Sequence, residues 1–96
     1  MNESPQYAPE RELLLATHDF PCAYVVKAFG PGEQEFRLGV KAAISGVMGD
    51  RAVYSERQTR SGRRVCISAV LDTNSVDEII AVYEALHALP QLRFIL

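Results

Sequence analysis

The alternation of strand-like and helix-like segments is the feature that most constrains how this chain folds. Residues 22–29 are rich in β-branched and aromatic side chains, which is typical of a strand. Residues 33–48 carry apolar side chains at spacings of three and four, which predicts an amphipathic helix. The same criteria predict further strands over residues 51–59, 64–71 and 92–96, and a second helix that begins after Ser75 and ends before Pro90.

The resulting order is strand, helix, strand, strand, helix, strand. Right-handed crossovers fold this order most readily into a four-stranded antiparallel sheet with two helices on one face. We therefore predict the α+β class and a ferredoxin-like (βαββαβ) sandwich. A chain of 96 residues builds a single core, and we assign residues 20–96 to this domain. Residues 1–19 are expected to form an N-terminal tail with a short helix over residues 10–17.

Each predicted element presents one apolar face to the core. The predicted core residues are Phe36, Val40, Ala43, Ile44 and Val47 in the first helix, Val65, Ile67, Ala69 and Leu71 in the third strand, and Val76, Ile79, Ile80, Tyr83 and Leu86 in the second helix. Gly39 and Gly46 lie at the margin of the first helix. Because each costs about 1 kcal/mol relative to alanine in a helix, we expect close backbone packing at both.

The second helix has the clearest start signal. Ser75 and Glu78 have the spacing of a capping box. In that motif the serine hydroxyl accepts a hydrogen bond from the glutamate amide, while the glutamate carboxylate reaches back to the amide of the capping residue. We therefore expect the helix to begin immediately after Ser75.

Composition and charge exclude several classes of protein. The net charge of −2 gives the chain no long-range attraction to nucleic acid or acidic membranes. No apolar run approaches the ~20 residues that span a bilayer, and the polar N-terminus lacks the features of a signal peptide. We therefore expect a cytoplasmic protein with no membrane partner. The two cysteines, Cys22 and Cys66, are too few for a disulfide framework or a zinc knuckle.

From Phe20 to Leu96 the chain resembles the small YbeD-like proteins, a bacterial family with an ACT-like variant of the ferredoxin fold. The matching residues are Phe20-Pro21, Lys27, Gly30, Phe36, Val40, Ser61-Gly62 and Tyr83-Glu84-Ala85-Leu86. The chain departs from the family where Arg64 and Cys66 stand in place of a tyrosine and then a serine, so any role of that strand surface is not carried over.

The resemblance implies a fold more than a function. Some family members are labelled lipoate regulatory proteins, which suggests an association with lipoate metabolism. ACT-like domains in general bind small molecules, often amino acids, at interfaces between domains. The resemblance supplies no catalytic residue.

A predicted hairpin carries the most unusual charge pattern. Residues 51–64 contain five of the ten basic residues, all arginine, and one acid, Glu56, which gives a local charge of +4. The planar fork of arginine suits carboxylates and phosphates. Gly62 is suited to a turn with positive φ. Four of these arginines, Arg57, Arg60, Arg63 and Arg64, are the candidate partner-binding residues; the alternative is a solvated hairpin whose charges discourage edge-to-edge pairing.

The other candidate sites favour ordinary structural roles. His18, Asp19 and Cys22 lie close together, but a metal site needs three or four ligands, so we predict no metal site, no catalytic residue and no cofactor. The Gly30-Pro31-Gly32 segment lacks a full phosphate-binding glycine pattern and is interpreted as a strand-to-helix turn. The strand over residues 64–71 has no aromatic side chain, so we do not expect sequence-specific RNA binding.

These observations support two hypotheses. The first is a regulatory or adaptor domain, not an enzyme, that binds an acidic protein partner or an anionic small molecule through the arginine-rich hairpin. The second is an ACT-like sensor of an amino acid or lipoyl compound, dimeric, with its ligand near the Gly30 turn. A homodimer would form through the sheet face or a sheet edge, because the strand over residues 92–96 is apolar.

Overall fold

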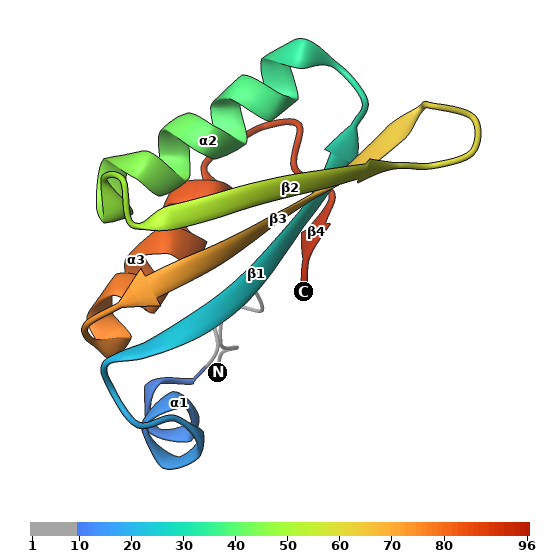
Figure 1. Cartoon of the computed structure of the whole chain (residues 1–96). Coiled ribbons are helices and arrows are strands. Elements are labelled where there is room, and N and C mark those ends of the chain that lie inside the picture. Colours follow the sequence, from blue (N-terminus) through green and yellow to red (C-terminus); the bar gives the residue numbers. More distant parts are fainter. Residues whose placement is uncertain (1–9) are drawn as a thin grey trace.

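Seven elements make up the described part of the chain. The computed structural model describes residues 10–96, so the loose tail predicted over residues 1–9 lies outside the described residues. The elements are α1 (Arg11–Thr17), β1 (Cys22–Pro31), α2 (Gln34–Met48), β2 (Ala52–Gln58), β3 (Arg64–Thr73), α3 (Val76–His87) and β4 (Phe94–Ile95). All six predicted elements are present, and α1 is the short helix predicted before them (Figure 1).

The four strands form one antiparallel sheet in the order β2-β3-β1-β4 (Figure 1). β1 and β3 are the central pair, with Cys22 opposite Thr73 at one end and Pro31 opposite Arg64 at the other. β2 pairs with β3 as the predicted hairpin, and β4 pairs with β1. The arrangement is compatible with the predicted ferredoxin-like fold.

The last strand is shorter than predicted. The prediction covers residues 92–96, whereas β4 contains only Phe94 and Ile95. The amide of Leu92 donates to the carbonyl of Leu89 at 3.2 Å, which keeps the segment after α3 in a turn. Leu96 and Lys27 still exchange two backbone hydrogen bonds, of 2.9 and 3.1 Å, so that pairing with β1 continues past β4.

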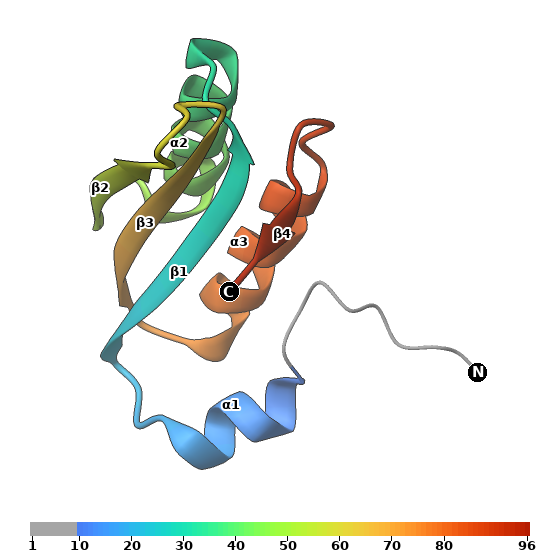
Figure 2. The ribbon, with the colours of Figure 1, turned by 90° about the vertical axis from the view of Figure 1, so that its right-hand side faces the viewer.

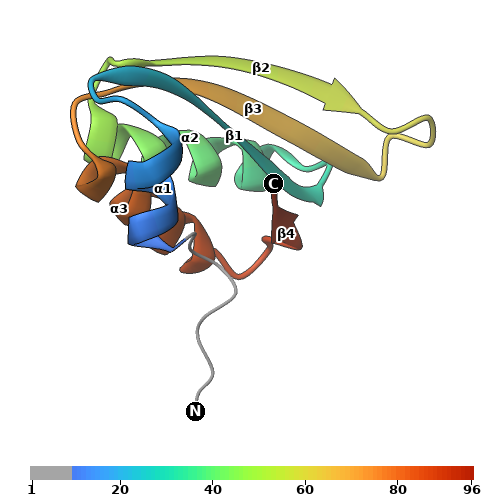
Figure 3. The same cartoon turned by 90° about the horizontal axis from the view of Figure 1, so that it is seen from below.

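The helices lie on one face of the sheet, and no described element covers the other face, hereafter the uncovered face (Figure 3). α2 and α3 pack against each other and against the strands. α1 lies near the end of the sheet at which β1 begins (Figure 2). It contacts α3, and its Leu14 is buried in the core, so this helix is docked on the domain.

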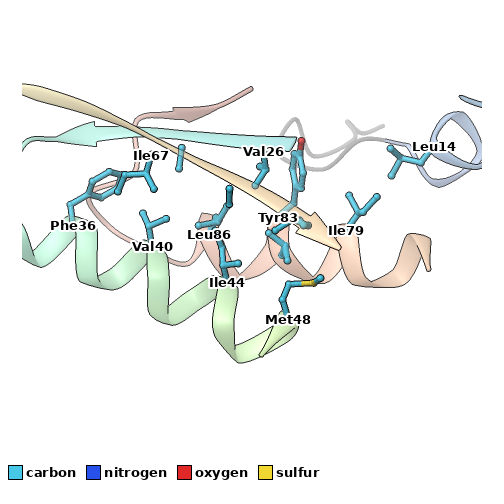
Figure 4. Close-up of a cluster of buried hydrophobic side chains, with 14 of the residues drawn as sticks. Leu14, Val26, Phe36, Val40, Ile44, Met48, Ile67, Ile79, Tyr83 and Leu86 are labelled. Carbon is cyan, nitrogen blue, oxygen red and sulfur yellow. The ribbon is translucent and has the colours of Figure 1, made fainter. Parts of the chain in front are cut away.

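The core fills the space between the sheet and the helices (Figure 4). The side chains predicted for β3 are all buried, as are Phe36, Val40 and Ile44 of α2. Met48 of α2 and Val82 of α3 are buried although they are not in the predicted set, and so are Leu14, Val26, Ala28 and Thr73 of other elements. Because α2 and α3 pack against each other as well as the sheet, each buries a wider face than the predicted stripe. The remaining predicted core residues divide into the buried Val76, Ile79, Tyr83 and Leu86 and the half-buried Ala43, Val47 and Ile80.

The predicted capping box forms only in part. Ser75 precedes α3, but its hydroxyl makes no capping hydrogen bond, because the Glu78 amide donates to the Ser75 carbonyl at 3.2 Å instead. The Glu78 carboxylate does reach back and accepts from the Asn74 amide at 2.8 Å. The serine half of the prediction is therefore wrong, and the glutamate half is confirmed, because the Glu78 carboxylate reaches back to backbone amides before α3.

Close packing is confirmed at one of the two helix glycines. A Cβ atom on Gly39 would lie 3.3 Å from Cδ2 of Leu89, so α2 approaches the segment after α3 closely there. A Cβ atom on Gly46 would meet nothing within 4 Å. The expectation of close packing at Gly46 is wrong, because that side of α2 faces solvent.

Candidate functional site

The β2–β3 hairpin carries the predicted arginine cluster on a tight turn. Gly62 has a φ of 75°, as its position in the turn predicts. The Gly62 amide donates to the Thr59 carbonyl at 2.9 Å, and the Thr59 amide donates to the Arg64 carbonyl at 3.0 Å. The hairpin projects beyond the helices at one end of the sheet (Figure 1). Its turn is therefore ordered by its own backbone and lies away from the helices.

Two charges of the hairpin segment are neutralised by other elements. Arg51 pairs with Glu78 through two contacts, of 2.5 and 3.2 Å, and donates to the carbonyl of Asp72. This ion pair and the Asn74 amide lower the pKa of Glu78 below its ordinary value. Glu56, the single acid of the segment, accepts from Arg37 of α2 at 2.7 Å. Arg51 thus has a structural role, and Glu56 is engaged by a helix.

The four candidate arginines keep their charges available. Arg57, Arg60, Arg63 and Arg64 are all exposed. None of them forms an ion pair within residues 10–96. Arg57 and Arg64 lie on the uncovered face of the sheet, since they share a face with Cys66 in the strand register, while Arg60 and Arg63 lie at the turn. The structure therefore divides the cluster between the sheet face and the tip of the hairpin.

A hollow of about 260 Å³ lies where the uncovered sheet face meets the hairpin. Its walls include Phe29 of β1 and Phe94 of β4, whose rings stack with centroids 4.4 Å apart and planes 13° apart. Arg57, Arg64 and Arg93 also line it. A second hollow, of about 490 Å³, shares Phe29 and Arg57 with the first and continues along the same face. The site is therefore larger than the hairpin alone.

Sequence reasoning missed Arg93 and Phe94 as members of this site. They follow Arg64 by about thirty positions in the chain, and no spacing motif joins them to it. The strand order places β4 beside β1, and the Arg93 amide donates to the Phe29 carbonyl at 2.8 Å, which holds this segment against the site. The only sequence signal for these two residues was the predicted strand over residues 92–96.

The uncovered face is mixed in polarity, as predicted from β3, and it also carries an apolar row. Val25, Val53 and Val70 lie side by side in the strand register and are 50%, 71% and 41% exposed. Phe94 and Leu96 are also exposed. Five of the eight exposed large hydrophobic side chains in the described part of the chain are on β1–β4 or directly after β4. This face is thus the principal apolar surface of the domain.

The cluster of His18, Asp19 and Cys22 has structural partners. Nδ1 of His18 lies 2.9 Å from the Thr17 hydroxyl, and Sγ of Cys22 lies 3.7 Å from the Thr73 hydroxyl. Among the described residues, no three histidine, cysteine or acidic side chains are grouped so that they could hold a metal ion. The arrangement offers no metal-binding geometry there.

The aromatic residues of β1 point to opposite faces. Tyr24 lies on the helix side, with its hydroxyl 3.2 Å from that of Tyr83, and burial raises the pKa of Tyr83 above its ordinary value. Phe29 lies on the uncovered side, where it stacks on Phe94. The face of β3 contributes no aromatic ring, so the two central strands do not form a base-stacking platform of the RNA-recognition type.

The glycine turn between β1 and α2 is closely packed. A Cβ atom on Gly30 would lie only 2.4 Å from Cζ of Phe36, and one on Gly32 would lie 2.4 Å from the carbonyl oxygen of Gly62. The Gly32 amide donates to the Arg63 carbonyl at 2.9 Å. The segment is therefore a strand-to-helix turn, as predicted, and it anchors the arginine-rich hairpin.

Fold and site together define a small α/β domain with one uncovered sheet face and an arginine-rich hairpin at its end. The chain belongs to the family described as Protein of unknown function (DUF493), whose model matches residues 16–96. This match is consistent with the YbeD-like resemblance. Comparisons with curated proteins and with solved structures give no match. No helix within residues 10–96 combines the length and the apolar character needed to cross a membrane.

Proposed function

We propose that this protein is a non-enzymatic regulatory or adaptor domain that acts by binding an acidic protein partner. The observation that carries the proposal is the set of four exposed arginines, Arg57, Arg60, Arg63 and Arg64, which have no ion pair within the described residues. Structural arginines in this domain, such as Arg51, do have carboxylate partners. A cluster of unpaired guanidinium groups on a projecting hairpin is complementary to carboxylates on another molecule.

The finer fold assignment is part of this proposal. We assign the domain to the ferredoxin-like, ACT-like folds, supported by the strand order and by the helices on one face. Within that assignment the YbeD-like resemblance suggests a link to lipoate metabolism, and the cytoplasmic location expected from the sequence stays part of the proposal. The family description itself names no activity.

The alternative, an ACT-like dimeric sensor with its ligand near the Gly30 turn, has less support. Phe36 packs against Gly30, and the hairpin packs against Gly32, so both glycines are in close contact with neighbouring groups. A ligand at that turn would have to displace one of them. The face of the sheet opposite the helices is exposed, which favours a binding surface there over one at the Gly30 turn.

The test is affinity capture from nuclease-treated cell lysate with the wild-type chain and a variant in which Arg57, Arg60, Arg63 and Arg64 are all replaced by glutamate. We expect a protein partner, identified by mass spectrometry, to be retained by the wild type and lost by the variant. Because these side chains are exposed and unpaired, we expect each substitution to change the free energy of unfolding by no more than about 0.5 kcal/mol.

The matched control replaces the same four arginines by lysine. It keeps the charge and removes the planar fork, so it should retain part of the capture if charge is the main contribution. Circular dichroism and thermal unfolding establish that all three proteins are folded. Equal capture by the wild type and the glutamate variant would show that the hairpin is only a solvated surface.

A further inference from the structure

The hollow beside the hairpin has an apolar base. Phe29, Cys66 and Phe94 contribute to its lining, and Phe29 lies opposite Cys66 on β3 and opposite Phe94 on β4 in the strand register. Phe94 remains 47% exposed although it stacks on Phe29. An aromatic ring left half exposed beside another gives an incoming apolar group a favourable surface to pack on.

The rim of the hollow is positively charged. Arg57 comes from β2, Arg64 from β3, and Arg93 from the segment that precedes β4. Among residues 10–96 no Asp or Glu side chain lines this hollow, and Glu56, which lines the adjoining one, is paired with Arg37. Three guanidinium groups from three segments around one apolar base would accept a ligand that presents an apolar group together with negative charge.

The hollow is one end of an elongated depression on the sheet face. Its own volume of about 260 Å³ is enough for one large side chain, and the adjoining hollow of about 490 Å³ shares Phe29, Arg57 and Cys66 with it, so a polypeptide chain could continue along the face. Interfaces between proteins commonly bury one aromatic or aliphatic anchor in such a depression, with polar contacts around it. The charged tip, with Arg60 and Arg63, then continues the contact along the partner chain.

We propose that this hollow binds one large apolar side chain of an acidic polypeptide, whose flanking carboxylates pair with Arg57, Arg64 and Arg93. The inference rests on the proposed function and specifies its partner: an acidic segment interrupted by an aromatic or aliphatic residue. A second copy of this chain is a poorer occupant when the two-fold axis passes through the hollow, because that arrangement brings the same arginines together and like charges oppose association.

The experiment measures the affinity of the full chain for three synthetic peptides, each with two glutamates on either side of a central alanine, leucine or phenylalanine. All three peptides have the same charge, so differences in affinity report on the central side chain. We expect the phenylalanine and leucine peptides to bind the wild type about tenfold more tightly than the alanine peptide, which corresponds to about 1.4 kcal/mol.

Two variants test whether the hollow causes the difference in affinity among the three peptides. Phe94→Ala removes one wall, and Cys66→Leu fills the base; either should abolish the difference among the peptides. The matched control is Val53→Ala, an apolar truncation at the far end of the same face, where the side chain is 71% exposed. It should leave the difference unchanged. Circular dichroism confirms that each variant is folded.

The outcomes separate this inference from the proposed function. Equal affinities for the three peptides, or a difference that survives in both hollow variants, overturn the inference. The three peptides could instead bind the wild type equally and fail to bind the variant in which Arg57, Arg60, Arg63 and Arg64 are replaced by glutamate. The hairpin then binds acidic polypeptides, so the proposed function stands although the inference is overturned. If no peptide binds the wild type, the inference is overturned, and lysate capture decides the proposed function independently.

Discussion

Gly32 holds the arginine-rich hairpin in position through a contact that only a residue without a side chain permits. Gly32 approaches the carbonyl of Gly62 so closely that a Cβ atom would lie 2.4 Å from its oxygen, and its amide donates to Arg63. The contact joins the β1–α2 turn to the hairpin, although the two are thirty residues apart in the chain. The orientation of the arginine-rich hairpin therefore depends on Gly32, which carries no charge itself.

We expect Gly32→Ala to lower the free energy of unfolding by about 1–3 kcal/mol, because the added methyl group meets backbone atoms that cannot rotate away. The matched control is Gly46→Ala, where the added Cβ would meet nothing within 4 Å. Since alanine is the better helix former, that variant should be more stable than the wild type by about 0.5–1 kcal/mol. Urea unfolding of both variants measures the difference. Equal stabilities would contradict the described packing at Gly32.

At the level of elements, an ion pair joins the start of β2 to the start of α3. Arg51 contacts both carboxylate oxygens of Glu78, and the Asn74 amide donates to the same carboxylate. The pKa of Glu78 is lowered, first by Arg51 and then by the Asn74 amide, so the folded state favours the ionised form. This stabilisation is present above the unfolded pKa of about 4.3 and is lost as the pH falls through the lower folded pKa.

We expect Glu78→Gln to lower the free energy of unfolding by about 1 kcal/mol at pH 7, the modest value of a partly exposed ion pair. The difference from the wild type should shrink as the pH falls below about 4, because the wild-type carboxylate then becomes protonated as well. Denaturant unfolding of both proteins over this pH range measures the difference in the free energy of unfolding. Glu84→Gln, an exposed substitution on the same helix, is the control and should change little. A difference that stays constant with pH would show that the charge of Glu78 is not responsible.

At the level of the whole molecule, charge is separated between the hairpin and the rest of the chain. The chain has a net charge of −2 and the four candidate arginines contribute +4, so the remaining residues carry −6. The proposed acidic partner would therefore be attracted to the hairpin more than to the rest of the chain. This separation favours a single docking orientation more than it raises affinity.

Binding of the glutamate peptide with a central alanine should weaken about five- to tenfold when the salt concentration rises from about 0.01 to 0.1 M, because the Debye length falls from about 30 to about 10 Å. Fluorescence anisotropy measures the affinity. A variant with Arg60→Gln and Arg63→Gln, which keeps the hollow, should bind more weakly and show a flatter salt dependence. The same steep dependence in that variant would place the electrostatic contact elsewhere.

The sequence by itself determined the elements and the charged hairpin, because the signals for both are local. Apolar spacing defined α2, β-branched runs defined β1 and β3, and Gly62 marked the turn. Met48 and Val82 were missed because their burial depends on the packing of two helices that are distant in the chain. The Ser75 cap failed for a local reason: the Ser75 carbonyl, and not its hydroxyl, accepts from the Glu78 amide.

Only the tertiary structure decided which charges are available and what lies beside them. Arg51 and Glu56 belong to the same run of sequence as Arg57, yet partners 27 and 19 positions away engage them. Arg93 and Phe94 join the site because β4 pairs with β1. The physical reason is the same in each case: sequence periodicity reports which face of an element is apolar, whereas ion pairs and hollows depend on which elements meet, and that is set by the packing of the whole chain.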